Sequence, residues 1–274
     1  MSADPLALCL AGHLSPEVAL ARLLLAGQSP DAIAARLQGR DEAGAEGLRS
    51  LLTSRRDALE ELGAMFADVR HDEPGLDAVR RLFDRAVARA PEASVAAYSL
   101  NDPAILTAAT DELVAWLDHA GLLQAAFDVL DLGCGIGRVA AAIAPRVRSV
   151  LGLDVSAAMI AEAERRCDAA NVRFATVGGT GVHVPFQSVD VVLAVDSLPY
   201  LLQAGVAEAH VRDCARALRP GGRLAIFNLS YRDSLAQDSA DLARWARAYG
   251  MQVEADGVAP FKLWDARAFV LRKP

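Results

Sequence analysis

The stretch VLDLGCGIGRVA, residues 129–140, combines an acidic residue with a glycine at every second position. Asp131 ends an apolar run, and Gly133, Gly135 and Gly137 follow it. Glycine permits a tight turn from a strand into a helix, and it lets ligand atoms lie against bare backbone. In α/β proteins such a turn lies at the carboxyl end of a strand, where nucleotides bind. The pattern therefore predicts a nucleotide-binding loop.

The spacing of these glycines distinguishes between classes of nucleotide. The dinucleotide fingerprint G-x-G-x-x-G would need a glycine at position 138, which is Arg138. A phosphate-binding loop of the Walker type would need G-K-[ST], and no such sequence follows. A nicotinamide-dependent oxidoreductase is therefore only the third interpretation of the loop.

Carboxylates also end two later apolar runs. SVLGLDVS contains Asp154, which lies at the end of the second apolar run. DVVLAVDSLPYL contains Asp196, the first polar residue after its run and a candidate general base. Plainer roles remain open: Asp131 and Asp196 could cap the segments that follow them, and Asp154 could be a solvated acid at a strand end.

The elements that must position these residues change in character along the chain. From about residue 127, short apolar runs alternate with helical stretches, which predicts parallel strands joined by crossover helices. We therefore expect a doubly wound α/β domain over residues 96–274, preceded by an N-terminal helical region over residues 1–95. That region would cover the site, form part of an acceptor pocket or make a dimer interface.

The helical region has clear start and stop signals. Ser15 and Ser29 each precede a proline, as N-cap residues do, and Asp102 precedes Pro103 in the same way. Leucine and phenylalanine at spacings of three, four and seven predict one amphipathic helix over residues 45–69. A further helix is expected over residues 75–90.

Composition excludes several classes of partner. The 274 residues have a net charge of −7 and only two lysines, Lys262 and Lys273, so no basic patch for nucleic acid is expected. The four cysteines lie far apart, which favours neither a disulfide framework nor a zinc site, and no metal is expected. The N-terminus lacks a basic leading region and a long apolar run. These features predict a cytoplasmic protein without a membrane segment.

The loop, the strand ending in Asp154 and the segment LRPGGRLAIFN, residues 218–228, together resemble class I S-adenosylmethionine-dependent methyltransferases. The resemblance spans residues 127–229. It implies a Rossmann-like sheet with an antiparallel last strand, S-adenosylmethionine as cofactor and S-adenosylhomocysteine as product. The residues it implies for the cofactor are Tyr98, Asp131, Gly133, Cys134, Gly135, Gly137, Asp154, Val155, Met159, Thr180, Gly181 and Asp196.

Individual roles follow from the same resemblance. Asp154 would bind the ribose hydroxyls, Met159 would lie on the adenine, and the ring of Tyr98 would suit a sulfonium. For Met159 and Tyr98, simple packing is an equal alternative. The catalytic candidates are Asp196 and Tyr200.

Two departures from the family pattern concern specificity. In GGTGVHVPF, Thr180 stands where many small-molecule methyltransferases have an acid for the adenine amine. The segment SLPY only partly resembles the N-P-P-Y motif of enzymes that methylate planar nitrogens.

The expected function is methyl transfer to a small-molecule acceptor by in-line displacement. A homodimer through the N-terminal helices is a further expectation. The alternative is a non-catalytic module that binds S-adenosylmethionine or a protein partner.

Overall fold

The computed structural model describes residues 4–69, 75–178 and 181–274, which form two compact units. The helical unit comprises residues 1–73, 85–112 and 261–265, and the sheet unit comprises residues 74–84, 113–260 and 266–274. The chain crosses between these units several times, so neither unit is one continuous stretch of sequence. The expected domain boundary between residues 95 and 96 stays a prediction.

The helical unit is built around a buried helix. Its elements are α1 (Pro5–Leu10), α2 (Pro16–Leu25), α3 (Pro30–Arg36), α4 (Ala43–Ser54), α5 (Arg56–Val69), α7 (Pro91–Val95), the 3-10 turn η1 (Ala97–Ser99), and parts of α6 (Leu76–Arg89) and α8 (Pro103–His119). Leu20, Leu23 and Leu24 of α2 are fully buried, and α2 packs against α1, α4 and α5. Burying three leucine side chains stabilises the unit by about 2 kcal/mol each.

The predicted helix starts are confirmed. The hydroxyl of Ser15 accepts a hydrogen bond from the Val18 N–H at 3.2 Å, and Ser29 caps α3 in the same way. The Asp102 carboxylate accepts one from the Ala104 N–H at 2.7 Å. These side chains satisfy N–H groups that the first turn of a helix leaves unpaired.

The expectation of one helix over residues 45–69 is wrong. Helix α4 ends at Ser54 and α5 begins at Arg56, because Arg55 leaves the helical conformation at φ −130° and forms an ion pair with Asp102. Leu52 and Leu59 are seven residues apart, a spacing that continues the apolar stripe across the break. Periodicity therefore cannot reveal it.

The tip of a β-hairpin completes the helical unit. The amides of Lys262 and Leu263 donate to the Glu112 carboxylate at 2.9 and 3.1 Å. Trp264 stacks between Phe261 and Tyr98, with ring centroids 5.3 and 5.8 Å apart. Segments that lie far apart in the sequence thus share one core in this unit.

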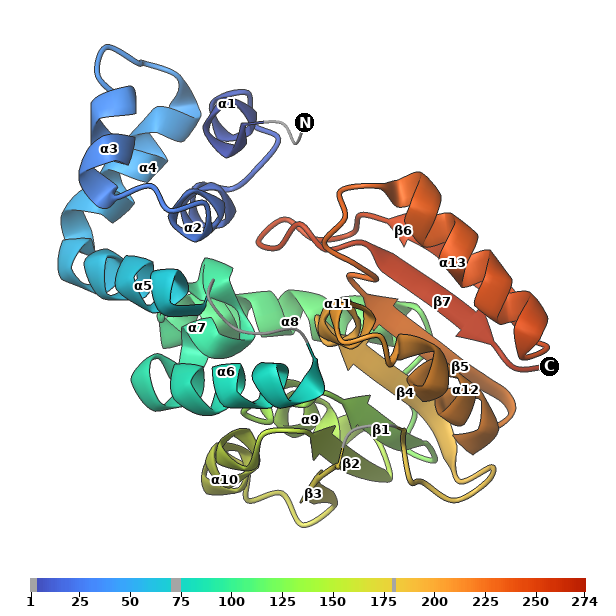
Figure 1. The fold of residues 1–274 in the computed structure, drawn as a ribbon. Helices are drawn as coiled ribbons and strands as arrows, with labels where there is room; N and C mark the ends of the chain where they lie inside the picture. Colours follow the sequence, from blue (N-terminus) through green and yellow to red (C-terminus); the bar gives the residue numbers. More distant parts are fainter. Residues whose placement is uncertain (1–3, 70–74, 179–180) are drawn as a thin grey trace. The chain divides into compact units, whose positions relative to one another are not determined.

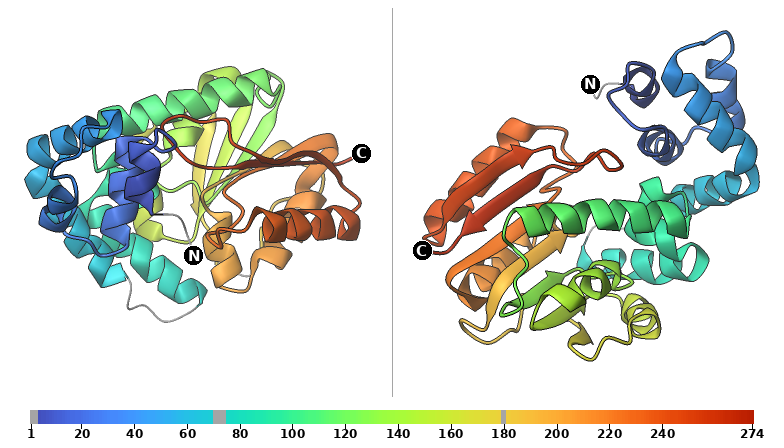
Figure 2. Two further views of the ribbon diagram at one scale, coloured as in Figure 1. Left: turned by 90° about the horizontal axis from the view of Figure 1, so that it is seen from above. Right: turned by 180° about the vertical axis from the view of Figure 1, so that it is seen from behind.

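The sheet unit has seven strands in the order β3-β2-β1-β4-β5-β7-β6 (Figures 1 and 2). The strands are β1 (Asp128–Leu132), β2 (Ser149–Asp154), β3 (Val172–Thr176), β4 (Val189–Val195), β5 (Leu218–Phe227), β6 (Gln252–Val258) and β7 (Ala268–Arg272). The first five are parallel, whereas β7 is antiparallel to both β5 and β6. The predicted doubly wound α/β sheet with an antiparallel last strand is confirmed.

Helices cover the sheet as the alternating pattern predicts. They are α9 (Arg138–Ile143) with the 3-10 turn η2 (Ala144–Arg146), α10 (Ala157–Arg166), α11 (Leu198–Gln203), α12 (Ala207–Ala217) and α13 (Leu235–Ala248). α9 and α10 pack on β2 and β3, whereas α12 packs on β5 and α13 on β6. After β3 the chain returns past β1 to form β4, so the strand order reverses between β1 and β4. Ligands bind at such a reversal, beyond the carboxyl ends of the strands.

The opposite, amino edge of the sheet is held by charges. Asp128 begins β1, and its carboxylate accepts hydrogen bonds from Arg148 Nε at 2.8 Å, Ser149 Oγ at 2.7 Å and Arg219 Nη2 at 2.9 Å. Arg219 also donates to Asp190 at 2.6 Å. This network joins the starts of β1, β2, β4 and β5, and its arginines hold the pKa of Asp128 well below its usual value, Arg148 contributing most.

We expect Asp128→Asn to lower the free energy of unfolding by about 2 kcal/mol at pH 7, because it removes charge-assisted hydrogen bonds. The lowered pKa means that the native state gains stability above pH 4 and loses it as the pH falls. The difference between variant and wild type should therefore shrink below pH 3. Urea denaturation at both pH values measures it.

Asp118→Asn is the control, because Asp118 pairs with Arg146 at 3.5 Å across an exposed surface. That variant should change stability by less than about 0.5 kcal/mol. Equal losses in the two variants would contradict a special role for the network.

Candidate active site

The glycine loop between β1 and α9 turns in the left-handed region at three positions. Gly133, Gly135 and Gly137 have φ values of 76°, 53° and 75°, which other residues rarely adopt. A Cβ on Gly133 would lie 2.3 Å from the Cβ of Ser197, and one on Gly137 would lie 2.7 Å from the ring of Phe174. At these two positions the backbone also approaches the protein's own side chains, so the turn needs glycine both for its φ values and for space.

Asp154 ends β2 and joins the glycine loop to the next helix. One carboxylate oxygen accepts a hydrogen bond from the Gly135 N–H and the other from the Ser156 N–H, both at 2.9 Å. The residue is only 8% exposed, so it is not a solvated acid at a strand end. Burial raises its pKa, and the two amides oppose that effect. Each oxygen has a second lone pair, so the carboxylate can accept further hydrogen bonds from a ligand.

Asp131 lies under the glycine loop on β1 and is almost completely buried. Its Oδ2 atom has no hydrogen-bond partner. Burial raises its pKa to about 7, with a smaller contribution from Asp154, while Arg138 and the Ala140 N–H act in the opposite direction. A buried carboxylate oxygen without a donor is unfavourable, and a ligand with a cationic group would relieve it.

Asp196 lies beyond β4 and is held by two side chains. Its Oδ1 accepts hydrogen bonds from the Tyr231 hydroxyl at 2.8 Å and from Asn228 Nδ2 at 3.0 Å. Asp196 and Asn228 have φ values of 58° and 61°, and the Asp196 N–H donates to the Phe227 carbonyl at 2.9 Å. Strained backbone of this kind occurs at functional sites, where the surrounding structure maintains it. The ends of β4 and β5 therefore form one polar cluster.

Aromatic rings line this cluster. Tyr200 of α11 makes edge-to-face contacts with Phe83 of α6 at 4.9 Å and with Tyr231 at 5.6 Å. Burial and the charge of Asp196 raise the pKa of Tyr200 to about 12, so its phenol stays protonated. Tyr231 is 47% exposed, yet its hydroxyl lies against Asp196. Burial of that hydroxyl, followed by the charge of Asp196, raises the pKa of Tyr231 well above its usual value.

The other predicted cofactor residues in the sheet unit surround the loop less directly. Cys134 is buried and its thiol pKa is raised by that burial, so it is an inert packing group. Met159 is 1% exposed in the first turn of α10, next to the half-buried Val155. Gly181 lies against Asp213, whose carboxylate would be 2.3 Å from an added Cβ.

Two predicted residues are not brought to the loop by the described structure. Thr180 lies outside the described residues. Tyr98 belongs to the helical unit, where it is buried and stacks on Trp264. Their roles at the cofactor stay predictions.

Asn228 and Tyr231 contact Asp196 and so belong to the candidate site, although the sequence motifs do not point to them. Both follow β5, in the segment that resembles the family pattern only up to residue 229. Asn228 is the first polar residue after an apolar strand, as Asp154 and Asp196 are, and this signal could have identified it. Tyr231 lies three residues further on and is not the first polar residue after a strand, so no such signal identifies it.

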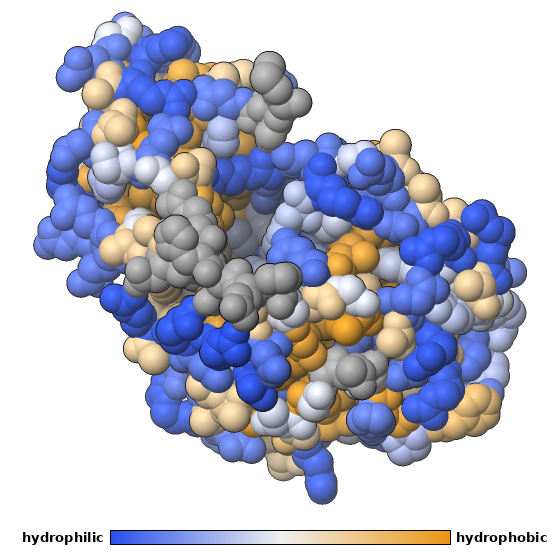
Figure 3. Space-filling view, viewed as in Figure 1, coloured by the Kyte–Doolittle hydropathy of each residue, from blue (hydrophilic) through white to orange (hydrophobic). Residues whose placement is uncertain are grey.

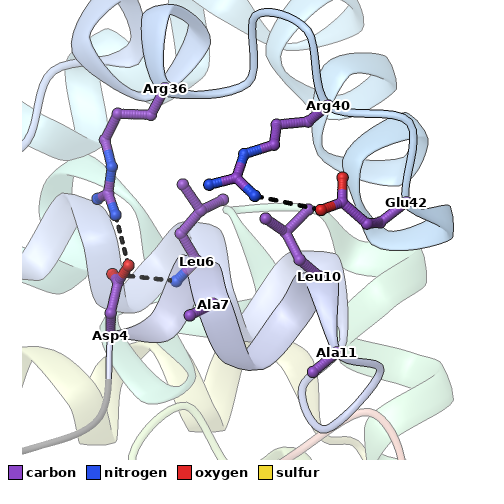
Figure 4. A pocket seen from close by; sticks show the side chains of 8 residues that line it. All are labelled: Asp4, Leu6, Ala7, Leu10, Ala11, Arg36, Arg40 and Glu42. Atoms are coloured by element: carbon purple, nitrogen blue, oxygen red, sulfur yellow. Dashed lines mark hydrogen bonds and ion pairs between the residues drawn. The ribbon is translucent and has the colours of Figure 1, made fainter.

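A pocket of about 470 Å³ lies in the helical unit (Figure 4). It is lined by Asp4, Leu6, Ala7, Leu10, Ala11, Arg36, Arg40 and Glu42. Arg36 pairs with Asp4 at 2.5 Å and Arg40 with Glu42 at 3.2 Å. Since each arginine that faces the pocket is paired with a carboxylate, the pocket offers no charge to attract an ionic ligand.

The described part of the chain shows neither a metal site nor a membrane-spanning helix. In residues 4–69, 75–178 and 181–274, no three His, Cys, Asp or Glu side chains gather in a way that could bind a metal ion. None of the helices in these ranges combines the length and the hydropathy needed to cross a membrane.

Comparison with known proteins agrees with this geometry. Residues 129–222 match the methyltransferase domain family. The chain is 32% identical to the methyltransferase GfsG of Streptomyces halstedii over 46% of this chain and 45% of that protein. It is 31% identical to the 27-O-demethylrifamycin SV methyltransferase of Amycolatopsis mediterranei over 53% of this chain and 54% of that protein. The chain thus spans about half the length of these relatives.

Among solved structures, a chain of a complex that contains the Haloferax volcanii Trm112 methyltransferase activator shares the fold. The TM-score is 0.51 at 19% identity, covering 70% of this chain and 96% of that one. The strand order, the glycine loop joined to Asp154 and the match over residues 129–222 identify a class I S-adenosylmethionine-dependent methyltransferase domain in this chain.

Proposed function

We propose that this protein transfers the methyl group of S-adenosylmethionine to a small-molecule acceptor and releases S-adenosylhomocysteine. One observation carries the proposal: the Gly135 amide and the Ser156 amide hold the Asp154 carboxylate at the turn of a methyltransferase domain. The carboxylate can then accept hydrogen bonds from ribose hydroxyls while it keeps the loop in shape.

The residues of the loop fit the two polar ends of this cofactor. Asp154 would hold the ribose, and Gly135 would lie against it. Asp131 has a buried oxygen without a donor. The amino group of the cofactor's methionine part is a cation that could supply that donor and stabilise the ionised carboxylate. A ligand that carries both a ribose and an ammonium group would therefore satisfy both acids.

The chain's own residues would mainly orient the acceptor. The sulfonium supplies an already activated methyl group, so holding the nucleophile in line is the main task of the protein. Asp196 would accept the proton of an acceptor hydroxyl or amine, directly or through the Tyr231 hydroxyl that donates to it. Phe83 and Tyr200 would pack against the apolar part of the acceptor.

The name of one relative supports a small acceptor, and the sheet unit exposes apolar side chains. Large apolar side chains of the sheet unit are exposed by 40–63%, Tyr231 among them. Figure 3 shows hydrophobic residues in orange beside hydrophilic ones in blue on the face that it displays. One relative is named for acting on 27-O-demethylrifamycin SV, a small molecule. An oxygen nucleophile would suit the carboxylate and phenol that we assign to the acceptor.

The cofactor assignment is tested by calorimetric titration with S-adenosylhomocysteine, with NAD as the control ligand. We expect binding of S-adenosylhomocysteine and none of NAD. Asp154→Ala should abolish binding, because it removes the ribose acceptor and releases the Gly135 amide. Asp168→Ala, at an exposed acid beyond α10, should bind as the wild type does. Binding of neither ligand by the wild type would overturn the assignment.

Replacing Asp131 should raise the free energy of unfolding but weaken the binding of S-adenosylhomocysteine. Because its pKa is raised to about 7, the native state loses stability as the pH rises from 4 to 7. Asp131→Asn should therefore raise the free energy of unfolding by about 1–3 kcal/mol at pH 8, with little change at pH 4.

The same variant should bind S-adenosylhomocysteine about tenfold more weakly at pH 8, since it lacks the charge that pairs with the amino group. Its affinity for 5′-deoxy-5′-methylthioadenosine, which has the ribose but no amino acid, should not change. In the wild type, affinity for S-adenosylhomocysteine should rise as the pH increases through 7. A variant that loses affinity for both ligands equally would argue against this contact.

Proton transfer is tested with an acceptor found by screening hydroxylated small molecules for release of S-adenosylhomocysteine. Asp196→Asn should lower kcat by about 100-fold if Asp196 accepts a proton. Tyr231→Phe should lower kcat less. Tyr249→Phe is the matched control, because the Tyr249 hydroxyl also donates to a carboxylate, that of Glu208 at 2.8 Å. Full activity of Asp196→Asn would rule out a base at this position.

A further inference from the structure

The first part of α6, residues 76–84, belongs to the sheet unit although it precedes the sheet by more than 40 residues. Asp84 lies at the end of this segment. Its Oδ1 accepts a hydrogen bond from the Ser156 hydroxyl at 2.6 Å and lies 3.4 Å from the Ala158 amide. An acid that far away in the sequence is therefore attached to the start of α10.

Ser156 connects Asp84 to Asp154, the carboxylate that we assign to the ribose. Its hydroxyl donates to Asp84 and accepts from the Met159 amide at 3.0 Å, so the side chain is fixed at both ends. Its own amide donates to Asp154 at 2.9 Å, and the residue is fully buried. A continuous chain of hydrogen bonds thus runs from Asp84 through Ser156 and Asp154 to the Gly135 amide.

The neighbouring residue attaches the same segment on the other side of the loop. Phe83 contacts the ring of Tyr200 on α11, which follows β4, whereas Asp84 contacts α10, which follows β2. The sheet order places β1 between β2 and β4. The pair Phe83–Asp84 therefore spans the carboxyl end of β1, where the glycine loop lies.

We propose that Asp84 is a positioning residue of the cofactor site, which sets the Asp154 carboxylate for the ribose through Ser156. The inference rests on the proposed function, since it assigns the ribose to Asp154. Without Asp84, the Ser156 hydroxyl would have no acceptor and could rotate, and the amide that orients Asp154 would lose its fixed place. A misoriented carboxylate binds a diol less well, because both hydroxyls must find acceptors at once.

The experiment measures S-adenosylhomocysteine binding by Asp84→Ala, Asp84→Asn and the wild type. We expect Asp84→Ala to bind about five- to tenfold more weakly, as the loss of one well-placed hydrogen bond does. Asp84→Asn keeps an acceptor for the Ser156 hydroxyl and should retain most of the affinity. Asp77→Ala is the control on the same helix, because Asp77 is 77% exposed and pairs with Arg80 at the surface.

A role in folding alone is separated by the choice of ligand. The wild type should prefer S-adenosylhomocysteine over its 2′,3′-dideoxy analogue, and Asp84→Ala should lose part of that preference. A general weakening of α10 would reduce the affinity for both ligands by the same factor. Adding Ser156→Ala to Asp84→Ala should cost less than the sum of the two single losses, because both changes break the Asp84–Ser156 contact, although Ser156→Ala also removes the acceptor of the Met159 amide.

Two results would overturn the inference: unchanged S-adenosylhomocysteine affinity in Asp84→Ala, or equal losses for the two ligands. Failure of the proposed function looks different, because the wild type itself would then not bind S-adenosylhomocysteine. Thermal unfolding of each variant shows whether the native fold is kept. If Asp84→Ala does not fold, the comparison of Asp84→Asn with Ser156→Ala decides, since the inference requires a greater loss in Ser156→Ala.

Discussion

The carboxylate of Asp154 is the point on which the candidate site depends. It is buried, and it accepts the amide of Gly135 from the loop after β1 and the amide of Ser156 from the start of α10. A buried charge is stable only when such donors surround it. Here the donors come from two turns, so the charge fixes both turns and keeps acceptor capacity for a ligand. The Asp154 carboxylate therefore stabilises both turns, and it is also the group that we assign to ligand binding.

The two edges of the sheet use charge differently. At the amino edge, Asp128 is surrounded by arginines, and its pKa is low. At the carboxyl edge, Asp131 lacks a donor for one oxygen, and its pKa is high. The first arrangement stabilises the folded chain, whereas the second is unfavourable as long as no donor or cation faces that oxygen. This contrast is typical of proteins whose sites are held ready by a rigid scaffold.

Sequence patterns predict the features that depend on neighbouring residues. The glycine loop, the strand alternation and the serine caps each arise within a dozen residues, and the structure confirms them. The break at Arg55 is not predictable, because it leaves the apolar spacing intact and because Asp102, which pairs with Arg55, lies 47 positions away. The helix propensity of the residues around Arg55 gives no sign of its ion pair with Asp102.

The same limit applies to the site. Asp196 is identified from its place at a strand end, but Tyr231 contacts it from 35 residues away and Asp84 reaches Ser156 across 72. Nor does the sequence show that Gly133 and Gly137 make room for Ser197 and Phe174 rather than for a ligand. Which side chains meet is decided by the strand order, and that order follows from packing of the whole sheet.

Helix α6 shows how a segment outside the sheet can link both halves of such a site. Phe83 and Asp84 are adjacent, yet one contacts the aromatic cluster next to Asp196 and the other the chain of hydrogen bonds that ends at Asp154. A shift of this helix would move Tyr200 and Ser156 together, since one rigid turn holds both neighbours. Under the proposed function, the orientation of the ribose and the walls of the acceptor site would both depend on the position of this helix. Each ligand would then stabilise the helix position that the other requires, which is how two sites become coupled in binding.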